Sequence, residues 1–214
     1  MHDDALHIED VPLPRFEFRS FGQDFDAVHF RMGRLSVPVP EKLWERRSDE
    51  IYIVSPATDV SITKIRDGTL DIRMWVQTVS ALEQWTAHMK GAFPLSAAAL
   101  RDVVWPALHV APPNLPAADS DLPAFLALVG DHAALQAVRV SKVRYGYMVH
   151  ETFCEYAVVH INGARVVSVC TESTDIPSVQ RTIQDTGMTG LENINYLQAI
   201  KRVTGMRPES LAGA

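Results

Sequence analysis

Charged residues recur at every second position in several short, otherwise apolar segments of the chain. The segment 15–19, RFEFR, places three charges around two phenylalanines. Side chains at i and i+2 lie on the same face of a β-strand, so each such segment directs its charges to one face and its hydrophobic residues to the other. The charged positions of this kind are Arg15, Glu17, Arg19, Lys64, Arg66, Asp71, Arg73, Lys142 and Arg144, with Glu155 and Glu172 inside apolar, β-branched runs.

These alternating positions are more cationic than the chain as a whole. They comprise seven cationic and four acidic residues, an excess of three positive charges, whereas the 214-residue chain has a net charge of −6. The polar face of an ordinary half-buried sheet carries mixed, largely uncharged side chains. A concentration of cations in an acidic protein indicates a small anionic ligand, and the overall acidity argues against binding duplex nucleic acid.

The strands predicted from this pattern are consecutive and linked by hairpins. Asp67-Gly68 and Asn162-Gly163 each separate two strand-like runs, and such dipeptides favour two-residue hairpin turns. The sheet should therefore be largely antiparallel. The predicted strands cover residues 15–21, 50–55, 61–66, 69–76, 137–149, 151–161 and 164–173.

The helices are predicted from apolar residues at helical spacing. Leu82, Trp85 and Met89, for example, fall on one side of a helix over 79–92, with Ser80 as its N-cap. The stretch 106–123 is rich in proline and alanine and is interpreted as a surface loop. The predicted helices cover residues 24–34, 79–92, 96–105, 124–136, 177–186 and 193–204.

Two arrangements would satisfy an antiparallel sheet with one charged face. The charged face could be solvated, or the sheet could close on itself and enclose the charges as the lining of a cavity. We expect the second, an α+β fold in which a closed antiparallel barrel or tunnel of about eight strands has helices packed outside. One domain is expected over residues 15–205, between a flexible N-terminal tail at 1–14 and a C-terminal tail at 206–214.

The composition also indicates a cellular compartment. The chain has no apolar run of membrane-spanning length, and its acidic start, MHDDALHIEDVPLP, lacks the apolar core of a signal peptide. A cytoplasmic location without membrane contact is expected. Cys154 and Cys170 both lie in predicted strands, where a pairing is geometrically allowed, but in a reducing compartment we expect two free thiols.

Lysine and arginine together are the side chains with which proteins hold phosphate. Arginine offers a planar fork and lysine a compact point charge. A triphosphate has several anionic centres, so cations from several strands around a lumen would contact it from all sides. Carboxylates in the same lumen suit Mg²⁺ or Mn²⁺, which would bridge to phosphate oxygens.

At these motifs the chain resembles the CYTH superfamily, the triphosphate tunnel metalloenzymes. Those proteins open with an E-x-E-x-K strand, carry K/R-x-R pairs on later strands and end with acidic barrel strands followed by helices. The resemblance spans roughly residues 15–204. It implies an eight-stranded antiparallel tunnel and activities such as inorganic triphosphatase, thiamine triphosphatase, RNA triphosphatase or class IV adenylate cyclase.

The resemblance assigns roles to individual residues. In RFEFR, Glu17 matches the second acid of the opening strand, while Arg15 replaces the first acid and Cys170 replaces one of the C-terminal acids. Glu17 and Lys64 would be catalytic. Phosphate would be bound by Arg15, Arg19, Lys64, Arg66, Arg73, Lys142 and Arg144, and the metal ion by Glu17, Glu155 and Glu172.

The function expected from these assignments is a phosphohydrolase that acts on an inorganic or organic triphosphate with Mg²⁺ or Mn²⁺. The replaced acids at 15 and 170 leave open a protein of the same fold that binds polyphosphate or a nucleotide without turnover. An adenylate cyclase is a further alternative. The expected partner is a small triphosphate-type anion, and the sequence leaves the oligomeric state open, a homodimer included.

Overall fold

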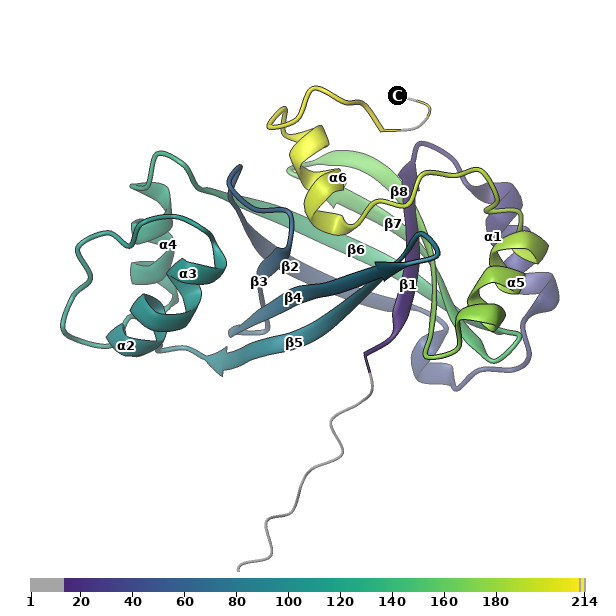
Figure 1. Ribbon diagram of the computed structural model, residues 1–214, viewed down its shortest axis with the longest axis horizontal. Coiled ribbons are helices and arrows are strands. Elements are labelled where there is room, and N and C mark those ends of the chain that lie inside the picture. The colour runs from purple at the N-terminus through teal and green to yellow at the C-terminus, as the bar shows by residue number, and fades with distance from the viewer. Residues whose placement is uncertain (1–13, 212, 214) are drawn as a thin grey trace, which may run out of the picture.

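Eight antiparallel strands close into a barrel in the computed structural model, which describes residues 14–211 and 213 (Figure 1). The order around the barrel is β1-β5-β4-β3-β2-β6-β7-β8, with the last strand pairing with the first. This confirms the predicted closed barrel. The strands are β1 (Phe16–Gly22), β2 (Arg46–Val54), β3 (Ser61–Arg66), β4 (Thr69–Val79), β5 (Leu82–Ala92), β6 (Gln136–Val149), β7 (Thr152–Ile161) and β8 (Ala164–Ser173).

The two sides of β1 are paired very unequally. On one side, β1 pairs with β8 along its whole length, from Phe16 to Gly22. On the other side, two residue pairs join β1 to β5, Phe16 with Gln84 and Glu17 with Glu83. The β1–β5 seam is therefore the shortest stretch of pairing that closes the barrel.

Helices cover the outside of the barrel in two groups (Figure 1). The helix α1 (Asp26–Leu35) and α5 (Ile176–Thr186) pack on the apolar outer side chains of β1, β7 and β8. The short helices α2 (Ala97–Ala99) and α3 (Trp105–Ala107), joined by one π-helical turn, pack with α4 (Leu122–Gly130) on the outer residues of β2 to β4. Both groups bury the apolar faces that the alternation predicted.

The last helix, α6 (Tyr196–Val203), lies across one end of the barrel (Figure 1). Asn195 caps its first turn, and Gln198 completes a capping box by accepting from the Asn195 backbone N–H. Its apolar side chains, including Leu197 and Ile200, join a core made by inward-facing residues of the strands. One end of the lumen is therefore filled by a hydrophobic core, and the charged residues lie toward the other end.

The helix predicted over 79–92 is wrong, because this segment forms the last residue of β4, a two-residue turn and the strand β5. Ser80 and Ala81 have positive φ and make a tight turn between β4 and β5. Ile72 pairs with Met89 but Arg73 pairs with Ala87, so one extra residue bulges out of β5. Leu82 and Trp85 are buried on opposite faces of β5, three residues apart, and the bulge returns Met89 to the outer face, so the three residues fall at helical spacing by coincidence.

Smaller differences concern the limits of elements. β2 begins at Arg46, four residues before the predicted strand, and α4 covers Leu122–Gly130 rather than 124–136. Asp121 caps α4 with its side chain, and Pro123 occupies the first turn, as is common for proline. The predicted tail at 1–14 lies outside the described residues apart from Pro14, and Leu211 of the predicted C-terminal tail is buried.

No helix in the described part of the chain is both long and apolar enough to cross a membrane.

Cys154 and Cys170 are free, buried thiols, as expected. Burial raises the pKa of both, that of Cys154 to about 11, so the reactive thiolate is scarce at neutral pH. We expect neither thiol to react with an aromatic disulfide reagent in the native protein, and both to react after denaturation in urea. Rapid labelling of the native protein would contradict this burial.

Candidate functional site

The charged side chains of the barrel line a cavity of about 210 Å³ inside the lumen. Six cationic and four acidic residues contribute to it, an excess of two positive charges. They come from seven of the eight strands, which a solvated sheet face would not bring together. The lining residues are Glu17, Arg19, Arg46, Glu50, Tyr52, Ile62, Lys64, Arg73, Trp85, Lys142, Arg144, Phe153, Glu155, Cys170, Glu172, Asn195 and Tyr196.

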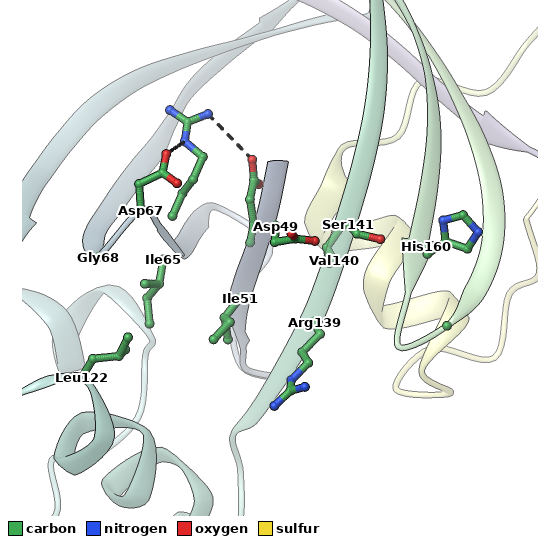
Figure 2. Close-up of a pocket in the computed structure, with 13 residues that line it drawn as sticks. Asp49, Ile51, Ile65, Asp67, Gly68, Leu122, Arg139, Val140, Ser141 and His160 are labelled. Atoms are coloured by element: carbon green, nitrogen blue, oxygen red, sulfur yellow. Dashed lines mark ion pairs between the residues drawn. The ribbon is translucent and has the colours of Figure 1, made fainter. Parts of the chain in front are cut away.

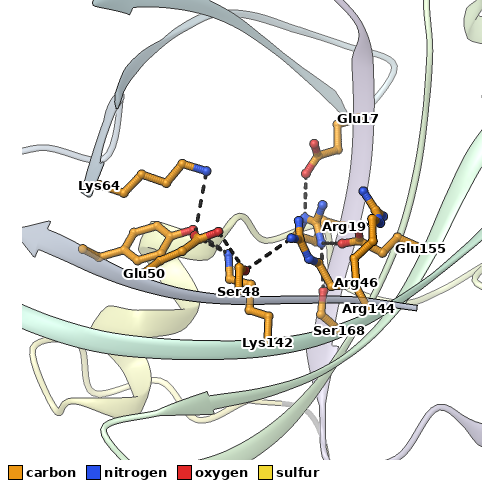
Figure 3. Close-up of polar contacts among 11 residues, drawn as sticks. Glu17, Arg19, Arg46, Ser48, Glu50, Lys64, Lys142, Arg144, Glu155 and Ser168 are labelled. Atoms are coloured by element: carbon orange, nitrogen blue, oxygen red, sulfur yellow. Dashed lines mark hydrogen bonds and ion pairs between the residues drawn. The ribbon is translucent and has the colours of Figure 1, made fainter. Parts of the chain in front are cut away.

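Glu50 is the centre of one group of buried charges (Figure 3). Its Oε2 lies 2.8 Å from Lys142 Nζ and 3.8 Å from Lys64 Nζ, and its side chain is fully buried. The Lys142 ammonium also donates to Tyr52 Oη at 2.8 Å and lies 3.6 Å from the centre of the Tyr196 ring. Two lysines from β3 and β6 therefore share one carboxylate deep in the lumen.

Burial alone would raise the pKa of the Glu50 carboxyl and lower that of the Lys142 ammonium, because it disfavours the charged form of each. Although burial opposes ionisation, Lys142 and Lys64 lower the pKa of Glu50 to about 2. Burial lowers the pKa of Lys142 to about 7, and the neighbouring Lys64 and Arg19 act in the same direction. Glu50 is thus a carboxylate at neutral pH, while Lys142 is close to the point at which it loses its proton.

Arg19 is the centre of a second group (Figure 3). Its Nε donates to Glu17 Oε1 at 2.7 Å, and its Nη1 donates to Ser168 Oγ at 3.1 Å. Glu155 lies 3.6 Å from the same guanidinium and accepts from Arg46 Nη2 at 2.7 Å. This group joins β1, β7, β8 and β2 around one side of the cavity.

Two guanidinium groups of the cavity retain an unsatisfied donor. Arg46 and Arg144 are opposite each other in the register of β2 and β6. The Nε atom of each is buried and has no hydrogen-bond acceptor among the described residues. A buried donor without a partner costs roughly 1–3 kcal/mol, so an anion that reached both atoms would remove that cost.

Three carboxylates form a row across adjacent strands. Glu17 on β1 stands opposite Glu172 on β8 and opposite Glu83 on β5. Glu83 accepts from Trp85 Nε1 and Asn195 Nδ2, so its carboxylate is held by neighbouring side chains. Glu17 and Glu172 each accept from one arginine through Oε1, and none of the described residues donates to their second oxygen.

The pKa values of Glu17 and Glu172 shift in opposite directions. Burial and the negative charge of Glu17 raise the pKa of Glu172. Burial opposes ionisation of Glu17 as well, but the Arg19 guanidinium lowers its pKa. Among the described residues, no three His, Cys, Asp or Glu side chains are already arranged as a metal site. Glu155, the third predicted metal ligand, lies beside Arg46 and Arg19 instead.

The structure brings most of the predicted phosphate-binding residues together. Arg19, Lys64, Arg73, Lys142 and Arg144 all line the cavity. Arg66 lies nearer the rim, 3.8 Å from Glu50 and 3.8 Å from Asp67. Arg15 is half exposed and pairs with Glu172 at 3.1 Å. The predicted roles of these side chains remain predictions, but five of the seven line one cavity, as the alternation predicted.

Several lining residues were not identified from the sequence. Glu50 begins the predicted strand and Arg46 lies four residues upstream of it, and extending the two-residue period back from Tyr52 would have found both. Trp85 was assigned to a helix because buried residues from both faces of β5 fall at helical spacing. Tyr196 enters the cavity from α6, and no local pattern indicates that a helix would cover this end of the barrel.

A larger hollow of about 630 Å³ lies on the outer face of β2 and β6 (Figure 2). Ile51, Ile65 and Leu122 form its apolar surface, and Arg139 and His160 lie on its exposed side. Of the predicted phosphate-binding residues, this hollow includes Arg66 alone. The concentration of charge therefore identifies the smaller cavity in the lumen as the candidate site.

Comparison with known proteins yields similar structures without close sequence relatives. No protein-family model matches the chain, and no curated protein matches it. Similar solved structures include a candidate adenylate cyclase from Bacillus halodurans (TM-score 0.49, 10% identity, covering 85% of this chain and 94% of that one). Others are a Hippeastrum protein described as having a dominant triphosphatase activity (0.45, 7%, 87% and 95%) and the Mimivirus capping enzyme triphosphatase (0.40, 9%, 81% and 89%).

At these identities the likeness concerns the fold alone. The structure itself confirms the predicted closed eight-stranded barrel with a charged lumen.

Proposed function

We propose that this protein binds a triphosphate-type anion in the lumen and hydrolyses it with a divalent metal ion. The observation that carries the proposal is the pair of buried, unsatisfied Nε donors of Arg46 and Arg144, in a cavity with an excess of cations. Phosphate oxygens are strong acceptors with the geometry that guanidinium groups match. A chain of phosphates would contact cations from several strands at once.

The size of the cavity supports a phosphate chain more than a nucleotide. Pockets for drug-sized ligands usually measure roughly 300–1,000 Å³, whereas this cavity measures about 210 Å³. Its walls are mainly charged. Inorganic triphosphate, or the triphosphate part of a larger molecule, fits this description better than a buried nucleoside does, and the cyclase alternative receives no support from the lining.

The carboxylate row fits a metal ion whose remaining ligands are supplied by the substrate. Mg²⁺ is usually bound by one or two carboxylates together with phosphate oxygens. Glu17 and Glu172 face each other, and each has one carboxylate oxygen without a protein donor. When bound there, Mg²⁺ or Mn²⁺ would neutralise charge that develops on the phosphoryl group and favour attack by water.

The protein side chains would supply position and charge. Lys64 and Arg73 lie near Glu17 and contribute to the low pKa of its carboxyl, so they would hold phosphate oxygens close to the carboxylate row. Arg46, Arg144 and Lys142 would bind the remaining phosphates from the opposite wall. No nucleophile from the protein is needed, because water can attack a phosphoryl group that is held in line.

Binding without turnover is the second candidate function. Arg15 replaces an acid of the family motif and pairs with Glu172, while Arg19 pairs with Glu17. If these ion pairs persist in the presence of ligand, the carboxylates would not be available to a metal ion, and the lumen would act as a receptor for polyphosphate.

Calorimetric titration of tripolyphosphate into the metal-free protein, repeated with Mg²⁺, separates the two candidates. Hydrolysis predicts tighter binding with Mg²⁺ and release of inorganic phosphate over time. Tight binding without the metal and no phosphate release would support the receptor. No binding under either condition would contradict both.

Lys142 should make the affinity for tripolyphosphate depend on pH. Because its pKa is lowered to about 7, the free protein loses this charge as the pH rises above neutrality, and a bound anion would restore it. Affinity should fall by up to about tenfold per pH unit above pH 7, with uptake of a proton. Titration in buffers of different ionisation enthalpy measures this uptake.

The ligand itself also titrates, so the Lys142→Met variant provides the reference. Subtracting its pH profile leaves the contribution of Lys142. Arg144→Gln removes another cation of the cavity and should keep the proton uptake of the native protein. Equal uptake in the native protein and in Lys142→Met would contradict the assignment to this lysine.

A further inference from the structure

The two halves of the lumen differ in chemistry. Toward one end, the inward positions of the strands carry the charged residues of the cavity. Toward the other end, the inward positions carry apolar side chains with almost no exposed surface, and the side chains of α6 pack among them. The apolar positions beyond the cavity include Phe21, Val54, Val138, Val159, Ile161 and Val166, while Tyr52, Ile62 and Trp85 belong to both the core and the cavity wall.

The boundary between the two halves is made by aromatic rings. The Tyr52 and Tyr196 rings stack with centroids 5.8 Å apart, and Phe21 meets Tyr196 edge-on at 4.9 Å. The ammonium of Lys142 lies over Tyr196 at 3.6 Å, and the guanidinium of Arg19 lies 4.9 Å from the same ring. The deepest cations of the cavity therefore rest on a wall of aromatic side chains that continues into the apolar core.

The segment that forms this wall is bonded to the barrel at its start. Ile194 donates its backbone N–H to Arg19 O at 2.8 Å, and the Arg19 N–H donates to Asn193 Oδ1 at 2.8 Å. Asn193 Nδ2 donates to Ala81 O at 2.7 Å, and Asn195 Nδ2 reaches Glu83. The entry to α6 is thus tied to both β1 and the β4–β5 turn.

The same helix is held at its other end by the buried ammonium of Lys201, whose carboxylate partner Asp59 is 34% exposed. Lys201 Nζ is fully buried, 2.7 Å from Asp59 Oδ1, and also donates to the carbonyl of Thr58. Both acceptors lie in the loop between β2 and β3. Moving α6 away would leave the buried Lys201 ammonium without its acceptors, and an uncompensated buried charge is strongly unfavourable. A helix that is fixed at both ends and buried along its apolar face is a permanent part of the fold rather than a lid.

We propose that the tunnel is blind, so that a linear phosphate chain enters only by its end, with the terminal phosphate against Lys142 and the aromatic wall of Tyr52 and Tyr196. This rests on the proposed function, because it concerns how the same anion reaches the same cavity. The substrates it admits are short polyphosphates and the ends of longer molecules. The rest of a longer chain leaves through the mouth at Glu172 and cannot pass through the barrel.

The number of protein molecules bound to one long chain tests the proposal. Linear polyphosphate long enough to pass through several barrels is mixed with excess metal-free protein at physiological salt, and the mass of the complex is measured by sedimentation. A blind tunnel predicts at most one protein molecule at each chain end, whatever the length of the chain. If the number of protein molecules bound per chain increases with chain length, the proposal is overturned. It is also overturned if protein that binds tripolyphosphate does not bind long chains.

Two variants of β6 show where the long chain binds. Arg144 lines the lumen, whereas Arg139 lies in the hollow on the outer face. Arg144→Gln should weaken the binding of tripolyphosphate and of long chains by the same factor, and Arg139→Gln should leave the binding of both unchanged. If Arg139→Gln weakens the binding of the long chain but not that of tripolyphosphate, the chain binds outside the barrel and the proposal fails. Absence of tripolyphosphate binding by the native protein would instead refute the proposed function itself.

Discussion

Replacing Glu50 with glutamine should destabilise the folded protein by about 3–5 kcal/mol, the usual effect of removing one partner of a buried ion pair. The substitution keeps the shape of the side chain but leaves Lys142 and Lys64 without the carboxylate that both now share. Urea unfolding followed by circular dichroism at neutral pH measures the change in the free energy of unfolding. A loss below about 1 kcal/mol would contradict a dry, tightly coupled group.

Asp67→Asn is the matched control for this experiment. Asp67 also forms an ion pair with a cation of β3, Arg66, at 3.8 Å, but its side chain is 92% exposed. Exposed pairs contribute at most about 1 kcal/mol, so the control should change stability little. The pH dependence adds a second readout. Burial already lowers the pKa of Lys142 and Lys64 in the native protein, and loss of Glu50 should lower both further, so stability should begin to rise with pH at a lower pH in Glu50→Gln than in the native protein.

Replacing Glu17 with glutamine should lower the rate of phosphate release from tripolyphosphate by about 100-fold or more. The proposed metal ion would lose one of its two carboxylates, and stabilisation of transition-state charge by a metal is worth several kcal/mol. Binding of tripolyphosphate without metal should be retained or strengthened, because a negative charge leaves the cavity. Steady-state release assays with Mg²⁺, paired with metal-free calorimetry, measure the two effects.

Glu83→Gln serves as the control in the same carboxylate row. Glu83 also faces Glu17, but Trp85 and Asn195 hold its carboxylate. Its replacement should leave the rate of release within a few-fold of the native value. If Glu17→Gln releases phosphate at the native rate, the metal-binding role of Glu17 is wrong, and equal losses in both variants would indicate a general disturbance of the row.

Local alternation was enough to predict the barrel but not every strand of it. Where a strand follows a strict two-residue period, as in Lys64–Arg66 and Lys142–Arg144, the sequence alone predicts which side chains share the lumen. In β5, one bulged residue breaks the period and the residues are good helix formers, so the helix was predicted where pairing with β4 decides the outcome.

The sequence predicted some residues of the candidate site and missed others, depending on whether they lie on regular strands. The charged residues on regular strands were found because parity alone assigns them to one face. Tyr196 and Asn195 reach the cavity from a helix that is distant in sequence, and only the packing of α6 against the end of the barrel places them there. The ion-pair partners were also hidden, because pairing depends on which strands become neighbours, as β2 and β6 do through Glu50 and Lys142.

The short seam between β1 and β5 has a consequence for local stability. Two residue pairs hold this junction, whereas β1 is joined to β8 along its whole length. Regions with few backbone hydrogen bonds open at a lower free energy than the whole protein unfolds. The amides at Glu17 and Glu83 should therefore exchange with deuterium sooner than those in the β6–β7–β8 wall. A bound anion that links Arg19 to Arg73 would bridge β1 and β4 across β5 and should slow that exchange.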